Sequence, residues 1–261
     1  MKGRLGLALF LGTALTVGWA AQAQDAGFVQ LTYGSIDLSD GYSDRDYVGL
    51  NSRFALSQDL AILLDITRQQ REEDVTSLGL GAEFSAGPGK LRLTAEGSDS
   101  DLGTAPDWKY ALGYRYDAGP ATGMIYDVEI SRAEYDGGVT TTTLKGEAIR
   151  YFPPNADGSY LVGQLRAGVT DSSGAADIGY DISAVATWVT PAGLNLGAEL
   201  GFGKMSYDLG TLTAVNNDYT AFKPFVSYRF SDNAELILRG EFVDTDLYDL
   251  QGASISVKFG L

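Results

Sequence analysis

The chain has 261 residues, with 19 Lys and Arg against 34 Asp and Glu and with neither His nor Cys. The formal charge of −15 repels polyphosphates, which argues against nucleic acid as a partner. The lack of Cys excludes a disulfide-stabilised fold, and the lack of His excludes a catalytic site with His as general base. The length suits one large β domain.

The first 23 residues have the pattern of a secretory signal peptide. Lys2 and Arg4 form a short basic region, residues 5–17 are apolar, and residues 21–23 are a small-x-small cleavage site. The apolar run is shorter than the ~20 residues that span a bilayer, which disfavours the alternative of a transmembrane anchor. We predict a signal peptide at 1–23. Without its two basic residues, 17 basic residues stand against 34 acidic ones, a formal charge of −17.

The mature chain, residues 24–261, follows one repeating sequence pattern from residue 28 onward. Segments of about ten residues alternate apolar and polar side chains and then end at Gly, Pro, Asn or Asp. A period of two is typical of β-strands. The pattern predicts about fourteen strands, with twelve as the alternative if the first pair or the pair within 121–152 is misassigned. The predicted strands are 28–35, 47–57, 60–70, 76–86, 91–100, 108–118, 121–135, 140–152, 160–171, 178–190, 194–207, 219–231, 234–245 and 252–261.

The connections between these strands fall into two alternating classes. Tight turns are predicted at 57–59, 87–89, 119–120, 191–193 and 231–233, and longer acidic loops at 36–46, 71–75, 98–107, 172–177, 208–218 and 246–251. Two joints fit this alternation less well: 136–138 is brief for a loop, and 153–159 is long for a turn. Short turns at one rim and longer loops at the other are typical of an outer-membrane barrel.

Aromatic residues gather at both ends of the predicted strands, as in the two interfacial girdles of a membrane barrel. Near the loop side stand Tyr33, Tyr47, Trp108, Tyr110, Tyr180, Phe202, Tyr207 and Tyr219, and near the turn side Phe54, Phe84, Tyr114, Tyr116, Trp188, Tyr228, Phe230 and Phe259. A soluble β-sandwich, the alternative, would cluster its aromatic residues centrally.

The last strand carries a pattern of its own. Ala253, Ile255, Val257, Phe259 and Leu261 alternate with other residues up to the final position. This resembles the C-terminal signal by which bacterial outer-membrane β-barrels of the porin-like family are recognised for assembly, although the usual final residue there is Phe. The resemblance implies an all-β protein, a single closed antiparallel transmembrane β-barrel in the bacterial outer membrane, with both termini in the periplasm. It also implies outer-membrane lipid and the barrel-assembly machinery as partners. Because the first strand starts close to the predicted cleavage site, we expect no plug domain.

The alternation places many charged side chains on the inward face. They are Arg53, Asp65, Glu83, Arg92, Glu96, Lys109, Arg115, Asp127, Glu129, Lys145, Glu147, Arg166, Asp181, Glu199, Arg229, Glu235, Arg239, Glu241 and Lys258. Arg or Lys facing lipid at the midplane costs roughly 2–4 kcal/mol, so these charges must face water or one another. They either line an aqueous pore or pair and fill the interior. Side chains fill the interior of a barrel of about eight strands, whereas barrels of 16–18 strands leave a channel. A count of fourteen strands therefore favours the pore.

These features predict a passive, mildly cation-preferring channel for small hydrophilic solutes or ions, without catalytic, cofactor or metal sites. The alternative is a closed, charge-filled barrel with a structural or adhesin-like surface role. The acidic loops at 71–74 and 244–249 offer oxygen ligands that suit calcium, but neither has an EF-hand pattern. We therefore expect solvated loop charge there.

Overall fold

The computed structural model describes residues 27–40, 44–70, 74–99, 105–135, 138–174, 176–208 and 214–261, the side chains at 207–208 and 214–215 excepted. The predicted signal peptide at 1–23 therefore lies outside the described residues. Within the described part of the chain, no helix is long and apolar enough to span a membrane.

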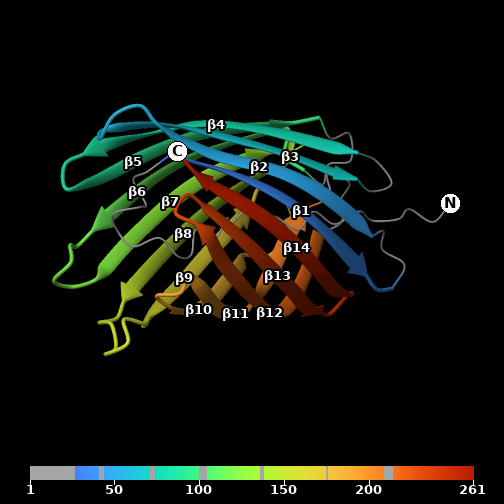
Figure 1. Ribbon diagram of the computed structural model, residues 1–261. Coiled ribbons are helices and arrows are strands. Elements are labelled where there is room, and N and C mark those ends of the chain that lie inside the picture. The colour runs from blue at the N-terminus through green and yellow to red at the C-terminus, as the bar shows by residue number, and fades with distance from the viewer. Residues whose placement is uncertain are drawn as a thin grey trace.

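Fourteen antiparallel strands form one closed barrel (Figure 1). They are β1 (Phe28–Leu38), β2 (Arg45–Ala55), β3 (Leu60–Gln70), β4 (Val75–Ala86), β5 (Gly89–Ser98), β6 (Trp108–Asp117), β7 (Met124–Glu134), β8 (Thr140–Tyr151), β9 (Tyr160–Ser172), β10 (Gly179–Val189), β11 (Leu194–Asp208), β12 (Ala214–Ser231), β13 (Ala234–Thr245) and β14 (Asp249–Gly260). Consecutive strands pair, and β1 closes the barrel on β14 from Phe28 opposite Gly260 to Leu38 opposite Leu250. The predicted closed all-β barrel of fourteen strands is confirmed, and no plug domain is present among the described residues.

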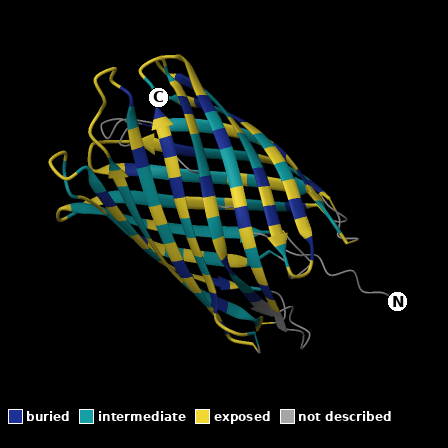
Figure 2. Ribbon diagram, turned by 90° about the horizontal axis from the view of Figure 1, so that it is seen from below, coloured by how far each residue is buried: buried dark blue, intermediate teal, exposed yellow. Residues whose placement is uncertain are grey.

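The outer face of the barrel is apolar. Buried and exposed positions alternate along the strands (Figure 2). The exposed set includes Leu31 at 51%, Leu165 at 62% and Leu200 at 63%. A continuous apolar belt of this kind is unfavourable in water, whereas hydrocarbon solvates it. The fold therefore places the strands across a bilayer.

Most of the predicted girdle residues lie on this outer face. Tyr33, Trp108 and Tyr180 near the loop rim are exposed, as are Trp188 and Phe259 near the turn rim. The prediction was wrong for Tyr47 and Tyr219, which pack inside the barrel against a buried apolar cluster. Both occupy inward positions of their strands, and the side-chain period of two decides the face regardless of aromatic character.

Several strands, among them β1, β2, β12 and β14, extend further into the loop rim than the sequence indicated. The start of β12 shows the largest difference: pairing with β11 continues to Asp208 opposite Ala214, within the predicted loop 208–218. Polar residues such as Asn216 and Asn217 take part in this hairpin because the ladder uses main-chain groups, whatever the side chain. For the same reason β14 begins at Asp249 rather than at 252.

The joint at 153–159, long for a turn, is ordered by local hydrogen bonds. Asn155 N donates to Ser159 O at 2.7 Å, and Gly158 has the positive φ of 82° that this turn requires. The Asp157 carboxylate accepts hydrogen bonds from the Ser159 hydroxyl at 2.6 Å and from its amide at 3.0 Å. These bonds, the hydroxyl one first, lower the pKa of Asp157 below its ordinary value.

The ladder between β12 and β13 is interrupted near its middle. Pairing stops at Phe222 opposite Phe242 and resumes at Phe225 opposite Arg239. Pro224 lies in this gap and has no amide hydrogen to contribute. The register itself is the same on both sides of the gap, and it shifts only later, between Arg229 and Ser231.

Candidate functional site: the charged inner wall

All the charged residues predicted to face inward occupy the inner positions of their strands, opposite in parity to the exposed apolar belt. The strand register also places opposite charges directly across from one another. These facing pairs are Glu83 and Arg92, Glu96 and Lys109, Arg115 and Asp127, Glu129 and Lys145, Glu147 and Arg166, and Arg229 and Glu235, which also faces Lys258. The inner wall thus carries interleaved charges of both signs along most strands.

Glu83 on β4 is the centre of one group of ion pairs. Its Oε1 lies 2.8 Å from Arg53 Nη2 on β2 and 3.9 Å from Lys90 Nζ on β5. Lys90 was missed by the sequence analysis because it directly follows the Gly-Pro-Gly turn, where strand alternation has barely begun. Asp65, on the intervening strand β3, accepts a hydrogen bond from Asn51 Nδ2 at 3.0 Å.

Arg92 on β5 bridges two carboxylates of β7. Its Nη2 lies 3.2 Å from Asp127 Oδ1 and 3.0 Å from Glu129 Oε2. The guanidinium reaches across β6 because Gly113 stands there: a Cβ at this position would lie 2.9 Å from Arg92 Nη2. A single glycine therefore permits an ion pair between strands that are not neighbours.

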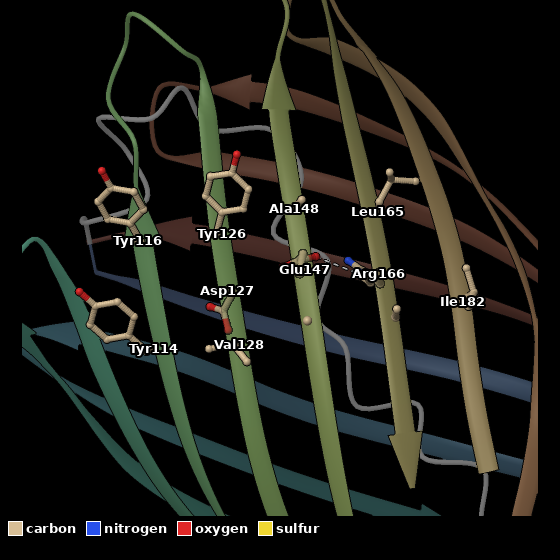
Figure 3. Close-up of a pocket in the computed structure, with 12 residues that line it drawn as sticks. Tyr114, Tyr116, Tyr126, Asp127, Val128, Glu147, Ala148, Leu165, Arg166 and Ile182 are labelled. Carbon is tan, nitrogen blue, oxygen red and sulfur yellow. Dashed lines mark hydrogen bonds and ion pairs between the residues drawn. The ribbon is translucent and has the colours of Figure 1, made fainter. Parts of the chain in front are cut away.

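Arg166 on β9 has the same arrangement on the next part of the wall. Its Nε lies 2.7 Å from Glu147 Oε1 on β8, and its Nη1 lies 3.3 Å from Glu199 Oε2 on β11 (Figure 3 shows the Glu147 pair). Gln164 also donates to Glu147. On β10, Asp181 lies over Gly168, where a Cβ would meet its carboxylate.

The wall of β11 to β14 is packed more tightly. Glu235 is 1% exposed and accepts hydrogen bonds from Ser227 Oγ at 2.5 Å and Asn195 Nδ2 at 3.5 Å. Lys223 Nζ lies 2.7 Å from Glu241 Oε1. Lys223 was not predicted to face inward, because its neighbours Phe222 and Phe225 lie on opposite faces and obscure the alternation.

Two further cations of this wall contact aromatic rings. The Arg239 guanidinium lies 5.9 Å from the centroid of the Phe225 ring, and Lys258 Nζ lies 4.5 Å from that of Phe28. Positive charge over the face of a ring is attracted by its quadrupole. These contacts hold both cations against the wall.

Water reaches the two halves of the inner wall to different extents. The side chains of Arg92, Glu129 and Glu147, on β5, β7 and β8, are 25–27% exposed. In contrast, Glu235 and Lys258 on β13 and β14 are 1% and 6% exposed as whole residues. Each inner ion pair described above joins either two neighbouring strands or two strands that are separated by a single strand. These pairs therefore neutralise charge along the wall.

At the loop rim, the inner face of β1, β2 and β12 to β14 carries an apolar cluster. Its buried members are Ile36, Ala221, Val243, Tyr248 and Leu250. The loop between β13 and β14 turns inward, so that Tyr248 is 1% exposed and its amide donates to Thr245 Oγ1 at 3.0 Å. Arg45 at the start of β2 is also buried there, and it was not among the predicted inward residues because 36–46 was predicted to be a loop.

Metal ligands do not come together in the described part of the chain: no three Asp or Glu residues form a group able to hold a metal ion. Residues 71–73 of one acidic loop lie outside the described residues. The other acidic loop, at 244–249, uses Asp246 Oδ2 to accept the Asp218 amide at 3.3 Å.

A closed barrel with an apolar outer belt and a charged inner face has the architecture of bacterial outer-membrane β-barrels. Solved structures of this class share the fold. They include a bacterial polysaccharide outer membrane secretin, with TM-score 0.55 and 6% identity over 91% of this chain and 99% of that chain. The Acinetobacter baumannii outer membrane protein Omp33 has TM-score 0.51 and 15% identity over 92% and 100% of the two chains.

An outer membrane channel from Pseudomonas putida F1 has TM-score 0.50 and 12% identity, over 90% of this chain and 94% of that chain. No protein-family model matches the sequence, and no curated protein sequence matches it. At such identities the likeness is one of fold. The predicted porin-like outer-membrane barrel is confirmed at that level.

Proposed function

We propose that the protein is a porin-like passive channel that carries small hydrophilic solutes or ions across the outer membrane, and that it is not an enzyme. The observation that supports this proposal best is the arrangement of the inner ion pairs along the wall, with the water-exposed side chains of Arg92, Glu129 and Glu147 on one side. Charges that are neutralised within the wall leave the interior free for water and solute.

The orientation of the barrel is part of the proposal. Both termini of the barrel, at Phe28 and Gly260, lie at the rim with the turns between β2 and β3 and between β4 and β5. We place this rim in the periplasm and the loop rim outside, as in other outer-membrane barrels. The C-terminal strand is then the segment that the barrel-assembly machinery recognises. The predicted mature charge of −17 supports a mild cation preference through attraction at the pore mouth.

The protein is expected to conduct ions in a planar lipid bilayer, in discrete steps, because water and ions cross a polar interior that is not filled. Single-channel recording of detergent-purified, folded protein measures this directly. A second candidate, the closed structural barrel, is supported by the buried wall around Glu235 and by the inward apolar cluster at Tyr248. Folded protein that passes no current at any voltage would decide for that second candidate.

Ion selectivity provides a sharper test of the same pore. Replacing Glu129 and Glu147 by Gln removes two water-exposed carboxylates, and we expect the cation-to-anion permeability ratio to fall by roughly half. The reversal potential in a salt gradient measures this ratio, and the difference should shrink at high salt as the field is screened. The matched control is Glu235→Gln, a buried carboxylate, which should leave the ratio unchanged. An equal effect of both changes would contradict a water path along β5 to β9.

A further inference from the structure

The outer wall carries a groove over β6 to β10. Its volume is about 540 Å³. The small residues Gly146, Ala148 and Ala167 line the groove together with larger ones such as Tyr126 and Leu165, and Figure 3 labels Tyr126, Ala148 and Leu165 on three different strands. These five residues are on the outer face by their strand parity. The lining also includes the inward-facing residues Asp127, Glu147 and Arg166, but most of it comes from outer positions, so the groove opens toward the hydrocarbon of the membrane.

Strand β8 creates the groove because two successive outer positions have almost no side chain. Gly146 lies between Val128 of β7 and Ala167 of β9, and Ala148 lies between Tyr126 and Leu165. A Cβ added at Gly146 would have no heavy atom within 4 Å. With a rise of ~3.4 Å per residue, the stretch from position 144 to position 150 is about 20 Å long, comparable to the ~15 Å hydrocarbon depth of one leaflet.

A cation lies beyond the lining of the groove, toward the turn rim. Arg150 follows Ala148 on the outer face of β8, and its guanidinium lies 4.9 Å from the centroid of the Phe152 ring. Phe152 lies over Gly163, where a Cβ would be 3.4 Å from its Cε2. Elsewhere at the turn rim, the outer positions of the described strands are aliphatic, aromatic or small, so Arg150 is the one basic side chain at that level. No carboxylate pairs with Arg150 among the described residues.

We propose that this groove binds one phospholipid of the periplasmic leaflet. An acyl chain lies over Gly146 and Ala148, and the phosphate pairs with the Arg150 guanidinium, a cation whose planar donors match phosphate oxygens. The leaflet assignment rests on the orientation proposed above, with the turn rim in the periplasm. Tyr116 and Tyr126 face each other across β6 and β7. Their aromatic rings would lie at the membrane–water interface, next to the headgroup.

The shape of the groove favours a lipid over a second copy of the chain. A stable interface buries about 800 Å² on each partner with close complementarity. Here the larger lining residues, Tyr126 at 45% and Leu165 at 62% exposure, project beyond the small ones and would hold another convex barrel away from them. A flexible acyl chain conforms to such a narrow trench, and the single cation beyond its end requires an anionic group.

Native mass spectrometry tests the proposal on folded protein reconstituted with phosphatidylethanolamine and phosphatidylglycerol and then released from the bilayer. The wild-type barrel should retain one phospholipid. Gly146→Leu should reduce the lipid-bound fraction about tenfold, because a Cβ there has no heavy atom within 4 Å and the added side chain would occupy the groove. Arg150→Gln should reduce it too, and this exposed replacement keeps the test valid if the leucine variant does not fold. Ala253→Leu, at an exposed outer position on β14, is the matched control and should keep the lipid.

Two results would overturn this assignment. One is equal lipid retention by the wild type, Gly146→Leu and Arg150→Gln. The other is a wild-type oligomer, seen by light scattering, that Gly146→Leu converts to a monomer without any retained lipid, which would make the groove a subunit interface. Bilayer conductance of the same variants should equal that of the wild type, so the outcome is independent of the proposed channel function.

Discussion

Deletion of residues 255–261 is expected to leave no folded protein in the outer membrane. The deletion removes the turn-rim half of β14, including Ile255 opposite Tyr33 of β1 and opposite Leu238 of β13. Two strands then present unpaired amide and carbonyl groups to lipid, each costing several kcal/mol. The heat-modifiable shift of the folded barrel on a gel, measured on outer-membrane fractions, should disappear.

A double replacement provides the control for this deletion. Ile255→Val with Val257→Ile keeps the alternation and the volume of the terminal strand, so it should fold and insert normally. A folded, membrane-inserted truncation would contradict the role of the last strand in closing the barrel and in its assembly.

Leu112→Arg is expected to impair insertion strongly. Leu112 is 43% exposed on the outer face of β6, in the middle of the strand, between Leu93 and Ile130 of the neighbouring strands. A guanidinium there faces hydrocarbon at a cost of roughly 2–4 kcal/mol. The yield of folded protein after reconstitution into vesicles, and its midpoint in denaturant, measure the loss.

The adjacent residue gives the matched control for Leu112→Arg. Ala111 lies on the inner face between Thr94 and Ser131. Ala111→Arg adds the same charge to the same strand but toward the polar interior, so it should cost much less. Equal losses for both replacements would contradict the assignment of inner and outer faces on β6.

Much of the fold follows from a period of two read along the chain. The bounds of β3 and β13 agree with the predicted ones, since Asp59 precedes β3 and Asn233 and Asp246 flank β13. This pattern no longer identifies a strand where the strand leaves the membrane, because the residues there are polar and do not alternate. Asn216-Asn217-Asp218 is such a segment, and it still pairs with β11 through its backbone. The prediction also misassigned Tyr47 and Tyr219, whose aromatic character suggested a girdle while their parity directs them inward.

The face of most charged residues was predictable, with Arg45, Lys90 and Lys223 as exceptions, but their partners were not. Parity alone assigns Glu129 and Lys145 to the interior, whereas only the register of β7 against β8 places them opposite each other. The contact of Arg92 with Asp127 additionally needs the missing side chain of Gly113. Such a relation joins three strands and leaves no trace in a local pattern. The same holds for the groove at Gly146, which depends on small residues of neighbouring strands coming together.

The interruption of the ladder at Pro224 has a consequence for local opening of the barrel wall. Where main-chain pairing between β12 and β13 is missing, side chains connect the two strands on both faces: Phe222 stacks on Phe242 outside, with ring centroids 6.3 Å apart, and Lys223 pairs with Glu241 inside at 2.7 Å. Local opening of a sheet starts where the fewest hydrogen bonds must break. Amide hydrogen exchange in the middle of the barrel should therefore be fastest beside this gap, and loss of either side-chain contact is expected to make it faster.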